Sequence, residues 1–506
     1  DLIPTDQHIG THGAGYDQVV AMYNWWQRAA APENTSVSQF KIQGYQPGPT
    51  PPNGVFLYSV SGFNSSGDPI TTNFYLEPSQ SVPATSEVAE ALGSDADSKV
   101  DVAGHSLGGH LALAFNTLFS GMTNDVATFN TPGFLDTTIN QQFFAALGGS
   151  VPADINSLNV TNVVADEAAI GAAPWNAVAG RHSRPGLDVD ISIENQWLSD
   201  EPNSAFPWNH GQQVLTDSLA VYNLLAELAP ELSTTGYKFI LAQASAGTAG
   251  SYERVVDSLA TLFNVNRTLL PTGNNNREAL YTEMYSIRAA MAPFVGQYEI
   301  FVTGLASDAS KAQQSDAEGL AYRFALKELS PFAVVGPSAV YAAHVSGGAL
   351  DIYNEATGEG KLTTQWIADR AQFLSWKAKT NASDRLYFAV DTESAGSAWY
   401  RDVALNEDVH VLPSNLFLAF PNLKTPQAVE AYLSDKFDAP RYFFGSDLPE
   451  DPPLIGDANA DFLYGGGGKD VEKGVRLGLL HKGAGGGLWR KRGTFANVLQ
   501  CGRGHD

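Results

Sequence analysis

The stretch VDVAGHSLGGHLALAF, Val100–Phe115, joins two side-chain patterns through a glycine-rich turn. Its first half alternates as a strand does, and from Leu107 onward apolar residues recur at helical spacing. Between the halves, Ser106 has a glycine two positions before it and another two positions after it. The arrangement predicts a strand, a turn too tight for a Cβ at either glycine, and a helix whose N-terminus faces the serine oxygen.

A serine at such a corner lies beside the first backbone amides of the helix, where the helix dipole favours negative charge. The amide of Leu107, directly after the serine, is therefore expected to donate to an oxyanion. A serine hydroxyl is a weak nucleophile unless a histidine accepts its proton and a carboxylate orients that histidine. The turn thus predicts that a histidine and an acid elsewhere in the chain lie close to Ser106.

Three histidines after Ser106 bear on the choice of base. His210, in the loop Phe206-Pro-Trp-Asn-His-Gly before a predicted helix, is preferred because catalytic loops collect at that edge of a sheet. His182, in Gly180-Arg-His-Ser-Arg, is its rival. His110 lies one turn into the helix of the corner and is expected to point away from the serine.

The preferred acid is Asp166, because it ends the apolar strand VTNVVA and begins a loop. Asp188 and Asp190 lie within a strand pattern, and Asp200 lies in an acidic loop. These three stay open as alternatives.

Composition narrows the class of protein. The chain has 506 residues, a formal net charge of −24 and a pI near 4.7, which argues against a nucleic-acid binder and suits a soluble exported protein. Cys501 is the single cysteine, so no intrachain disulfide can form. No run of 18 apolar residues is present, so we expect no transmembrane segment. The chain begins at Asp1 without a methionine or a signal region, as a fragment or a processed product would.

Four regions follow from the patterns along the chain. Residues 1–232 alternate strands and helices, which predicts a mainly parallel α/β sheet. Residues 233–440 are mostly helical in pattern, residues 441–474 carry repeats, and residues 475–506 form an atypical basic tail that we leave out of the argument. In the first region the predicted strands are Gly54–Phe63, Lys99–Ala103, Asp125–Phe129, Val160–Ala165 and Leu187–Ile193, and the predicted helices are Gln18–Arg28, Leu107–Phe119 and Gln212–Leu228.

The repeats are two tandem nine-residue units, Gly456–Tyr464 and Gly465–Lys473, each with glycine first and aspartate sixth. Such units are typical of a calcium-binding parallel β-roll, in which aspartates and turn carbonyls supply oxygen ligands. The second unit departs from the pattern, because Glu472 stands where an apolar side chain would point inward. The predicted Ca²⁺ ligands are Gly456, Asp457, Asp461, Gly465, Gly466 and Asp470.

These motifs resemble a known family. The segment Gly104-His-Ser-Leu-Gly-Gly109 resembles the serine turn of the class 3 lipases, and Ala127-Thr-Phe-Asn-Thr-Pro-Gly133 resembles their next strand and turn. Val163-Val-Ala-Asp166 resembles the strand that carries their acid, and His210 falls where they keep the catalytic histidine. Gly180-Arg-His-Ser-Arg-Pro-Gly186 resembles a structural segment, which would give His182 no catalytic role. With the repeats, the chain is similar to calcium-binding secreted bacterial lipases and phospholipases A.

The resemblance implies an α/β-hydrolase-like fold with a helical additional region and a short C-terminal parallel β-roll. It implies a Ser106–Asp166–His210 triad that cleaves lipid esters, at a lipid–water interface, in a monomer that needs Ca²⁺. It also implies export by a bacterial route that uses no signal peptide. The alternatives are a short-chain or polyester esterase and a non-catalytic calcium-binding surface protein or adhesin.

One part of the family pattern is missing. The second oxyanion donor of these lipases lies in an Arg-Gly-Thr-like turn upstream of the serine, and this sequence has none. Gly13–Gly15 and Ser61–Phe63 are the nearest substitutes, and we expect the natural gene to encode a further strand and turn before Asp1. The aromatic residues Trp175, Phe206 and Trp208 are candidates to line an acyl site, and core packing, the more common role of such residues, is the alternative.

Overall fold

The computed structural model describes most of the chain. The described residues are 8–46, 48, 51–89, 99–152, 159–167, 182, 184–194, 210–244, 251–266, 277–382, 388–391, 398–413, 440–445, 462–465, 470–472, 479–482 and 499–501. The chain divides into two compact units, each described by itself. The first unit comprises Asp1–Glu167, Ala173–Ile191 and Phe206–Leu215, and the second comprises Ala168–Ala172, Ser192–Ala205 and Thr216–Asp506. The predicted domain 1–232 therefore contains the whole first unit and the beginning of the second.

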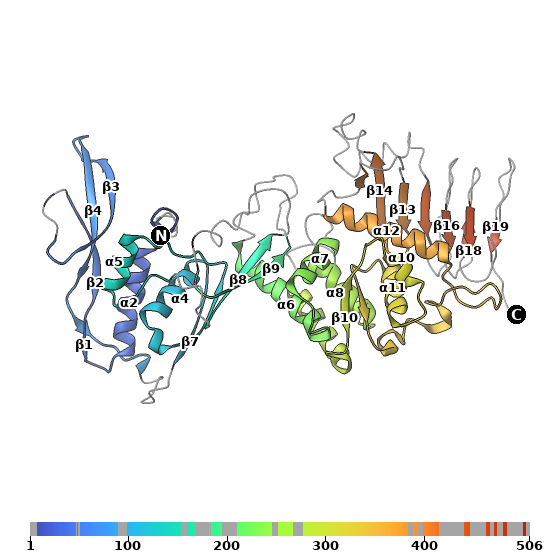
Figure 1. The fold of residues 1–506 in the computed structure, drawn as a ribbon, viewed down its shortest axis with the longest axis horizontal. Coiled ribbons are helices and arrows are strands. Elements are labelled where there is room, and N and C mark those ends of the chain that lie inside the picture. Colours follow the sequence, from blue (N-terminus) through green and yellow to red (C-terminus); the bar gives the residue numbers. More distant parts are fainter. Residues whose placement is uncertain are drawn as a thin grey trace. The chain divides into compact units, whose positions relative to one another are not determined.

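A four-stranded sheet forms the centre of the first unit (Figure 1). Its strands are β6 (Val100–His105), β7 (Thr123–Phe129), β8 (Val160–Glu167) and β9 (Leu187–Ile193), in that order. The β6–β7 and β7–β8 pairs are parallel. Helix α4 (Leu107–Leu118) connects β6 to β7 and is followed by a 3₁₀ turn at Ser120–Met122, and α5 (Thr138–Ala146) lies between β7 and β8 in the chain. The predicted parallel α/β sheet is thus confirmed for this part.

Helix α2 (Tyr16–Ala30) packs with α4 and α5 around the apolar core of this unit. Its buried face follows the helical spacing of its apolar residues, as the sequence predicts. The core side chains include Tyr16, Val19, Leu113, Phe134, Phe143 and Phe144.

The first unit has a second sheet that the sequence pattern did not predict. Strands β2 (Phe40–Tyr45), β3 (Val55–Phe63) and β4 (Pro69–Pro78) pair antiparallel in the order β2-β4-β3. The assignment of Gly54–Phe63 to the parallel sheet is therefore wrong, because only five residues separate β3 from β4 and parallel pairing needs a much longer crossover. A short antiparallel pair, β1 (Ser36–Val37) and β5 (Val82–Pro83), completes this part.

Helices dominate the first part of the second unit, as predicted. They are α6 (Gln212–Leu228), which begins in the first unit, α7 (Thr234–Ala244), α8 (Ser251–Leu262), α9 (Arg277–Met291), α10 (Asp308–Ala312), α11 (Ala317–Glu328) and α12 (Thr364–Ala382). Strands β10 (Glu299–Val302) and β11 (Phe332–Val335) pair antiparallel among them. Short 3₁₀ turns span Ala292–Phe294, Ser338–Tyr341 and Ser346–Gly348.

A six-stranded sheet follows the helices, in the order β12-β14-β13-β15-β16-β18. Its strands are β12 (Phe388–Asp391), β13 (Ala398–Asp402), β14 (Glu407–Pro413), β15 (Arg441–Phe444), β16 (Phe462–Gly465) and β18 (Leu479–Lys482). The run from β13 through β15 and β16 to β18 is parallel and in register. A separate pair joins β17 (Asp470–Glu472) to β19 (Leu499–Cys501). These strands do not by themselves establish the predicted β-roll.

Aromatic side chains stack across the parallel strands. The rings of Tyr400 and Tyr442 lie 4.6 Å apart, and those of Tyr442 and Phe462 also lie 4.6 Å apart. We call these three rings, with the Phe444–Tyr464 pair at 4.9 Å, the aromatic ladder. Helix α12 packs against it through Phe373, which stacks on Tyr400 and Phe444.

Candidate active site

Ser106 lies at the corner that the sequence predicts, between the end of β6 and the start of α4. Its backbone has φ 55° and ψ −121°, a conformation that residues other than glycine rarely adopt. A Cβ added to Gly104 would come within 2.2 Å of the Gly108 backbone. A Cβ on Gly109 would come within 2.6 Å of the Thr131 side chain, whereas one on Gly108 would meet open space. The expectation that Gly108 lacks room is therefore wrong, and Gly109 takes that role because it faces Thr131.

His210 lies next to the serine, although 104 residues separate them in the chain. Its Nε2 is 2.8 Å from the Oγ of Ser106. Burial, together with the neighbouring His105, lowers the pKa of His210 to about 4. The ring is therefore neutral near pH 7 and can accept the serine proton. The structure brings together these two predicted residues.

Two side chains that the sequence analysis missed hold the backbone of His210. His105 Nε2 donates to the His210 carbonyl at 2.8 Å, and Asn130 Nδ2 donates to the same oxygen at 3.3 Å. We call His105 and Asn130 the carbonyl clamp. Because a carbonyl only accepts, the clamp assigns the Nε2–H tautomer to His105.

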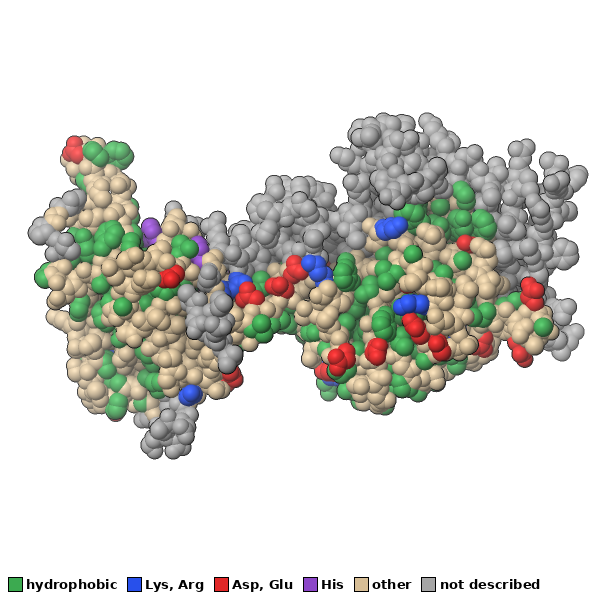
Figure 2. Space-filling model, in the orientation of Figure 1, with side chains coloured by type: hydrophobic (Ala, Val, Ile, Leu, Met, Phe, Trp, Pro, Cys, Tyr) green, Lys and Arg blue, Asp and Glu red, His purple; other side chains and the backbone are tan. Residues whose placement is uncertain are grey.

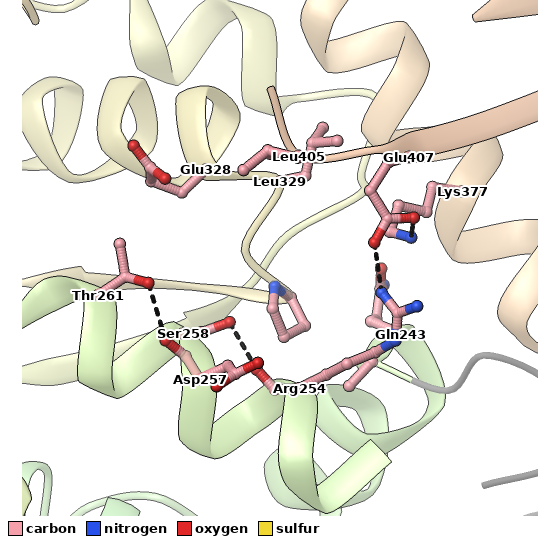
Figure 3. A pocket seen from close by; sticks show the side chains of 12 residues that line it. Gln243, Arg254, Asp257, Ser258, Thr261, Glu328, Leu329, Lys377, Leu405 and Glu407 are labelled. Atoms are coloured by element: carbon pink, nitrogen blue, oxygen red, sulfur yellow. Dashed lines mark hydrogen bonds and ion pairs between the residues drawn. The ribbon is translucent and has the colours of Figure 1, made fainter. Parts of the chain in front are cut away.

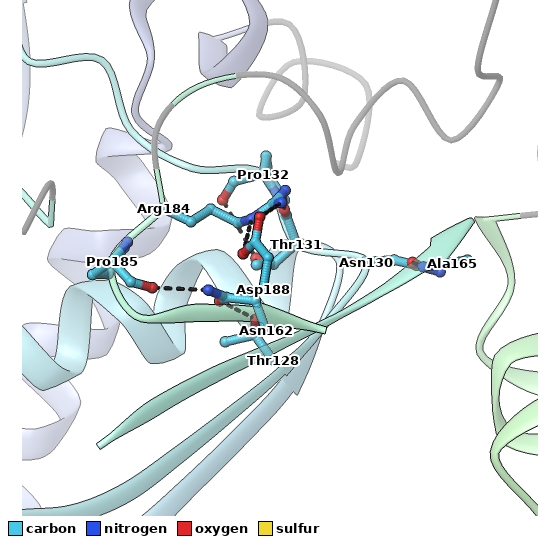
Figure 4. A network of polar contacts seen from close by, with 9 residues as sticks. All are labelled: Thr128, Asn130, Thr131, Pro132, Asn162, Ala165, Arg184, Pro185 and Asp188. Carbon is cyan, nitrogen blue, oxygen red and sulfur yellow. Dashed lines mark hydrogen bonds and ion pairs between the residues drawn. The ribbon is translucent and has the colours of Figure 1, made fainter. Parts of the chain in front are cut away.

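Asn130 also positions the end of β8, where Asp166 lies. Its Oδ1 accepts a hydrogen bond from the Ala165 amide at 2.8 Å (Figure 4). One buried amide group thus binds the backbone of both His210 and the residue before Asp166. Asp166 is the next-to-last residue of β8, so the predicted acid lies at the same edge of the sheet as the serine and the histidine.

The signal for Asn130 in the sequence was its position directly after an apolar strand, in Thr128-Phe-Asn-Thr131. Its φ of 49° places it in the left-handed region, which asparagine tolerates better than most residues. The role itself depends on three segments that meet only in the folded chain, so spacing alone could not have revealed it.

The rival histidine, His182, binds elsewhere. Its Nε2 is 3.1 Å from the carbonyl oxygen of Ile9. Nearby, Arg184 forms an ion pair with Asp188 and donates from Nη1 to the Thr131 carbonyl at 3.2 Å (Figure 4). Asp188, an alternative acid, is therefore engaged by an arginine.

A chain of buried amide and hydroxyl groups fastens this segment to the sheet. Asn162 Nδ2 donates to the Pro185 carbonyl at 2.8 Å, and Thr128 Oγ1 donates to Asn162 Oδ1 at 2.7 Å. Thr131 Oγ1 donates to the carbonyl of Ser106 at 3.2 Å, which links the same network to the serine corner. The segment around His182 therefore supports the site without presenting its histidine to Ser106.

His110 has a structural role in the corner. Its Nε2 accepts from the Gly15 amide at 3.1 Å, and its Nδ1 lies 3.3 Å from the Pro132 carbonyl. Burial lowers the pKa of His110 to about 3, so the ring is neutral and Nδ1 carries the proton. The fully buried ring stacks on Phe134 and connects the N-terminal segment to α4.

The oxyanion donors can be placed only in part. Leu107 is the first residue of α4, so its amide is at the predicted helix N-terminus. In the Gly13–Gly15 turn, the Gly13 amide donates to the Ile9 carbonyl at 2.9 Å and the Gly15 amide donates to His110. Two of the three amides of that substitute are therefore already used. Ser61–Phe63, the other substitute, lies in the outer part of the β3–β4 hairpin.

Several predicted residues lie outside the described part of the chain, namely Trp175, Phe206, Trp208, Asp200, Gly456, Asp457, Asp461 and Gly466. Of the predicted Ca²⁺ ligands, Gly465 ends β16 and Asp470 begins β17. Within the described ranges, no group of three histidine, cysteine, aspartate or glutamate residues could hold a metal ion. The described residues alone therefore do not form the predicted calcium site.

The second unit contains a polar cavity of about 210 Å³ (Figure 3). Glu407 bridges two cations there, at 2.7 Å from Arg254 Nη1 and 2.6 Å from Lys377 Nζ. Burial opposes ionisation of Glu407, but Lys377 and Arg254 outweigh it and lower the pKa of this carboxyl. The two cations thus stabilise the ionised carboxylate of Glu407 in the cavity.

Comparisons of the chain with family models, curated proteins and solved structures find no match. Among the helices that the structure describes, none is long and apolar enough to cross a membrane.

Proposed function

We propose that this protein is a serine hydrolase that cleaves carboxylic ester bonds of lipids, as a triacylglycerol lipase or a phospholipase A does, on an α/β-hydrolase-like fold. One observation carries the proposal: Ser106, in its strained corner, has its Oγ 2.8 Å from Nε2 of a neutral histidine. A strained serine beside a base at hydrogen-bonding distance is the arrangement that activated nucleophiles require.

In the proposed mechanism Ser106 Oγ attacks the ester carbonyl while its proton passes to His210 Nε2. The carbonyl oxygen becomes an oxyanion, which the Leu107 amide stabilises together with the positive end of α4. His210 then returns the proton to the departing alcohol, and an acyl-serine remains. Water, deprotonated by His210, attacks the carbonyl of the acyl-serine. The bond to Ser106 Oγ then breaks, His210 returns the proton to that oxygen, and the fatty acid leaves.

The remaining groups in this mechanism position His210. The carbonyl clamp of His105 and Asn130 fixes the backbone of His210, so that the ring keeps its Nε2 toward the serine. Asp166 at the end of β8 would accept from Nδ1–H of His210 and stabilise the imidazolium that forms. The shared contact of Asn130 with Ala165 and His210 supports this assignment, because it holds both backbones at one place.

An active-site-directed phosphonate ester tests the proposal directly. The whole chain should take up one phosphonyl group, and mass spectrometry of its peptides should place that group on Ser106. Ser106→Ala should take up none, and His210→Ala should react far more slowly, because the serine then lacks its base. A folded chain that stays unlabelled, or carries the label on another residue, would overturn the assignment.

A further inference from the structure

The outer half of the β3–β4 hairpin is a two-stranded ribbon. Strand β2 pairs with β4 only as far as the Tyr45–Asn73 pair, whereas β3 and β4 continue together to the Phe63–Pro69 pair. We call residues 60–72 the outer ribbon. The buried core side chains of the hairpin, Leu57, Tyr58, Tyr75 and Leu76, all precede or follow this ribbon. Within the described part of the chain, no residue of this ribbon belongs to the buried core, and two strands without a core on either face are marginally stable in water.

The tip of the outer ribbon is apolar and nearly uncharged. Phe63 is 77% exposed and Val60 is 49% exposed. Hydrophobic side chains gather at the tip of the projecting hairpin in Figure 2, beside a single acidic group. No lysine or arginine occurs between Lys41 and Lys99, and Asp68 is the one charged residue of the ribbon. Val60 and Phe63 are three residues apart on β3, so their side chains lie on opposite faces of the ribbon, and a ribbon that entered an apolar phase tip first would bury both.

The turn at the tip is held rigid by its own hydrogen bonds. Asn64 Oδ1 accepts from the amides of Ser66 and Asp68 at 2.9 and 2.8 Å, and Asn64 Nδ2 donates to the Asp68 carboxylate at 3.2 Å. The Asn64 amide also donates to the Asp68 carbonyl at 2.9 Å. The only charge of the ribbon is thus used inside the turn, directly after Phe63.

The base of the hairpin leads to the candidate active site. The ring of Tyr58 stacks on that of His12 at 5.3 Å. Three residues later in the chain, the Gly15 amide binds His110, in the helix that begins after Ser106. The outer ribbon therefore belongs to the same compact unit as Ser106 and His210, and a surface that binds the ribbon also binds that unit.

We propose that the outer ribbon anchors the protein to a lipid surface without net charge, with Phe63 and Val60 inserted among the acyl chains. The choice of a lipid as the occupant rests on the proposed function. The choice of an uncharged surface follows from the charges: the chain carries a net charge of −24 and the ribbon offers no cation to an anionic lipid.

Vesicle binding by the full chain with Ser106→Ala tests the anchor without hydrolysis. This protein should cosediment with phosphatidylcholine vesicles, and more weakly with vesicles of phosphatidylglycerol. Adding Phe63→Ser should lower the partition coefficient into phosphatidylcholine about tenfold, since the transfer of one exposed phenylalanine is worth at least that factor. Phe239→Ser is the matched control, because Phe239 is 55% exposed on α7 in the second unit, and it should change nothing.

Each outcome decides between the occupants. Equal partition of the Phe63→Ser and Phe239→Ser proteins, or no binding of the parent to phosphatidylcholine, would overturn the anchor. A shift from dimer to monomer on Phe63→Ser would instead identify a second copy of the chain as the occupant. Hydrolysis of a water-soluble ester by the chain that keeps Ser106 separates the two proposals. Val60→Ser, which lies outside the candidate oxyanion turn, should leave this hydrolysis unchanged, whereas a failed catalytic proposal would leave no hydrolysis to compare.

Discussion

Ser106 is held in its rare conformation by contacts on both sides of its peptide. Its amide donates to the Phe129 carbonyl at 2.9 Å, and its carbonyl accepts from the His110 amide at 3.1 Å and from Thr131 Oγ1 at 3.2 Å. A backbone of this kind costs about 1–3 kcal/mol, which such contacts offset. The serine is thus fixed toward the histidine before any substrate binds.

At this scale the two candidate histidines, His210 and His182, should differ in their effect on activity. His210→Ala should lower ester hydrolysis nearly as much as Ser106→Ala, by up to about 10⁶-fold, because the two residues act as a unit. His182→Ala should cost less than about tenfold, because His182 contacts the Ile9 carbonyl and not the serine. Turnover of a soluble ester measures all three variants. If His182→Ala proved the more damaging histidine variant, the base would have to be reassigned.

Sequence alone was sufficient for some of these residues and not for others. Ser106 and His210 were predictable because a local turn signal marks the serine and chain order limits the histidine. Asn130 and Gly109 were not, because their roles arise from contacts with Ala165, His210 and Thr131 that exist only after β7, β8 and the following loops meet. The sequence predicted two residues that the structure brings together, and missed the residues that position them.

At the scale of elements, the corner between β6 and α4 needs a glycine at position 109 and not at position 108. Gly109→Ala should lower the free energy of unfolding by about 1–3 kcal/mol, because its Cβ would press on Thr131. Gly108→Ala should instead raise it by about 0.5–1 kcal/mol, since alanine is favoured over glycine in a helix and the space is open. Denaturant unfolding of the two variants measures both changes. Equal destabilisation by both would contradict the packing described for the corner.

The strands show why some elements were easier to predict than others. Strands β6, β7, β8 and β9 were found within about two residues, because apolar or alternating segments of strand length stand out between the helical patterns. The partner of β3 was not found, because β4, Pro-Ile-Thr-Thr-Asn-Phe-Tyr-Leu-Glu-Pro, has few apolar residues in its first half. That half belongs to the outer ribbon, where no core selects apolar side chains.

The repeats give a prediction for the C-terminal strands. Calcium chelation should increase proteolytic cleavage between Gly445 and Gly474 and leave the sheet around Ser106 protected. Clustered aspartates repel one another without the ion, and a ligand that binds only the folded form stabilises it. Limited proteolysis with and without chelator measures the difference. Equal protection in both conditions would make these residues a linker without bound calcium.

At the scale of the whole molecule, the two units differ in their buried titratable groups, because the second unit buries carboxyl groups with raised pKa values as well as a histidine. His110 and His210 in the first unit have pKa values lowered by burial to about 3 and about 4. In the second unit, burial raises the pKa of Glu194 to about 7 and that of Asp308 to about 6. Each unit therefore has its own response to acid.

Acidification from pH 7 to pH 5 should destabilise the first unit more than the second. A histidine in the unfolded chain binds a proton near pH 6.5. Each histidine that is buried in its neutral form therefore lowers the folding equilibrium constant about tenfold for each pH unit between pH 6.5 and its pKa in the folded protein. Glu194 and Asp308 act in the opposite sense, because their folded forms bind protons earlier than the unfolded chain does. Their stabilising effect in acid offsets the destabilising effect of His410 in the same unit, whose pKa is lowered by burial to about 4. Hydrogen exchange at both pH values, followed by mass spectrometry of peptides, would resolve the units. Larger protection losses in the second unit would contradict this assignment.

The aromatic ladder has a consequence for how the protein resists mechanical force. Each parallel strand from β13 to β18 is bonded only to its immediate neighbours, and the rings of Tyr400, Tyr442 and Phe462 follow the same succession. Force applied to β18, the edge strand of this sheet, therefore acts on one pair of neighbouring strands at a time, and the strands should separate in steps that begin at β18. This stepwise separation should stop at Phe444 of β15, because two side chains of α12 contact its ring: Arg370 through a cation–π contact and Phe373 by stacking. Under force applied beyond β18, the strands should therefore unfold one after another while α12 and the helices before it in the chain stay folded.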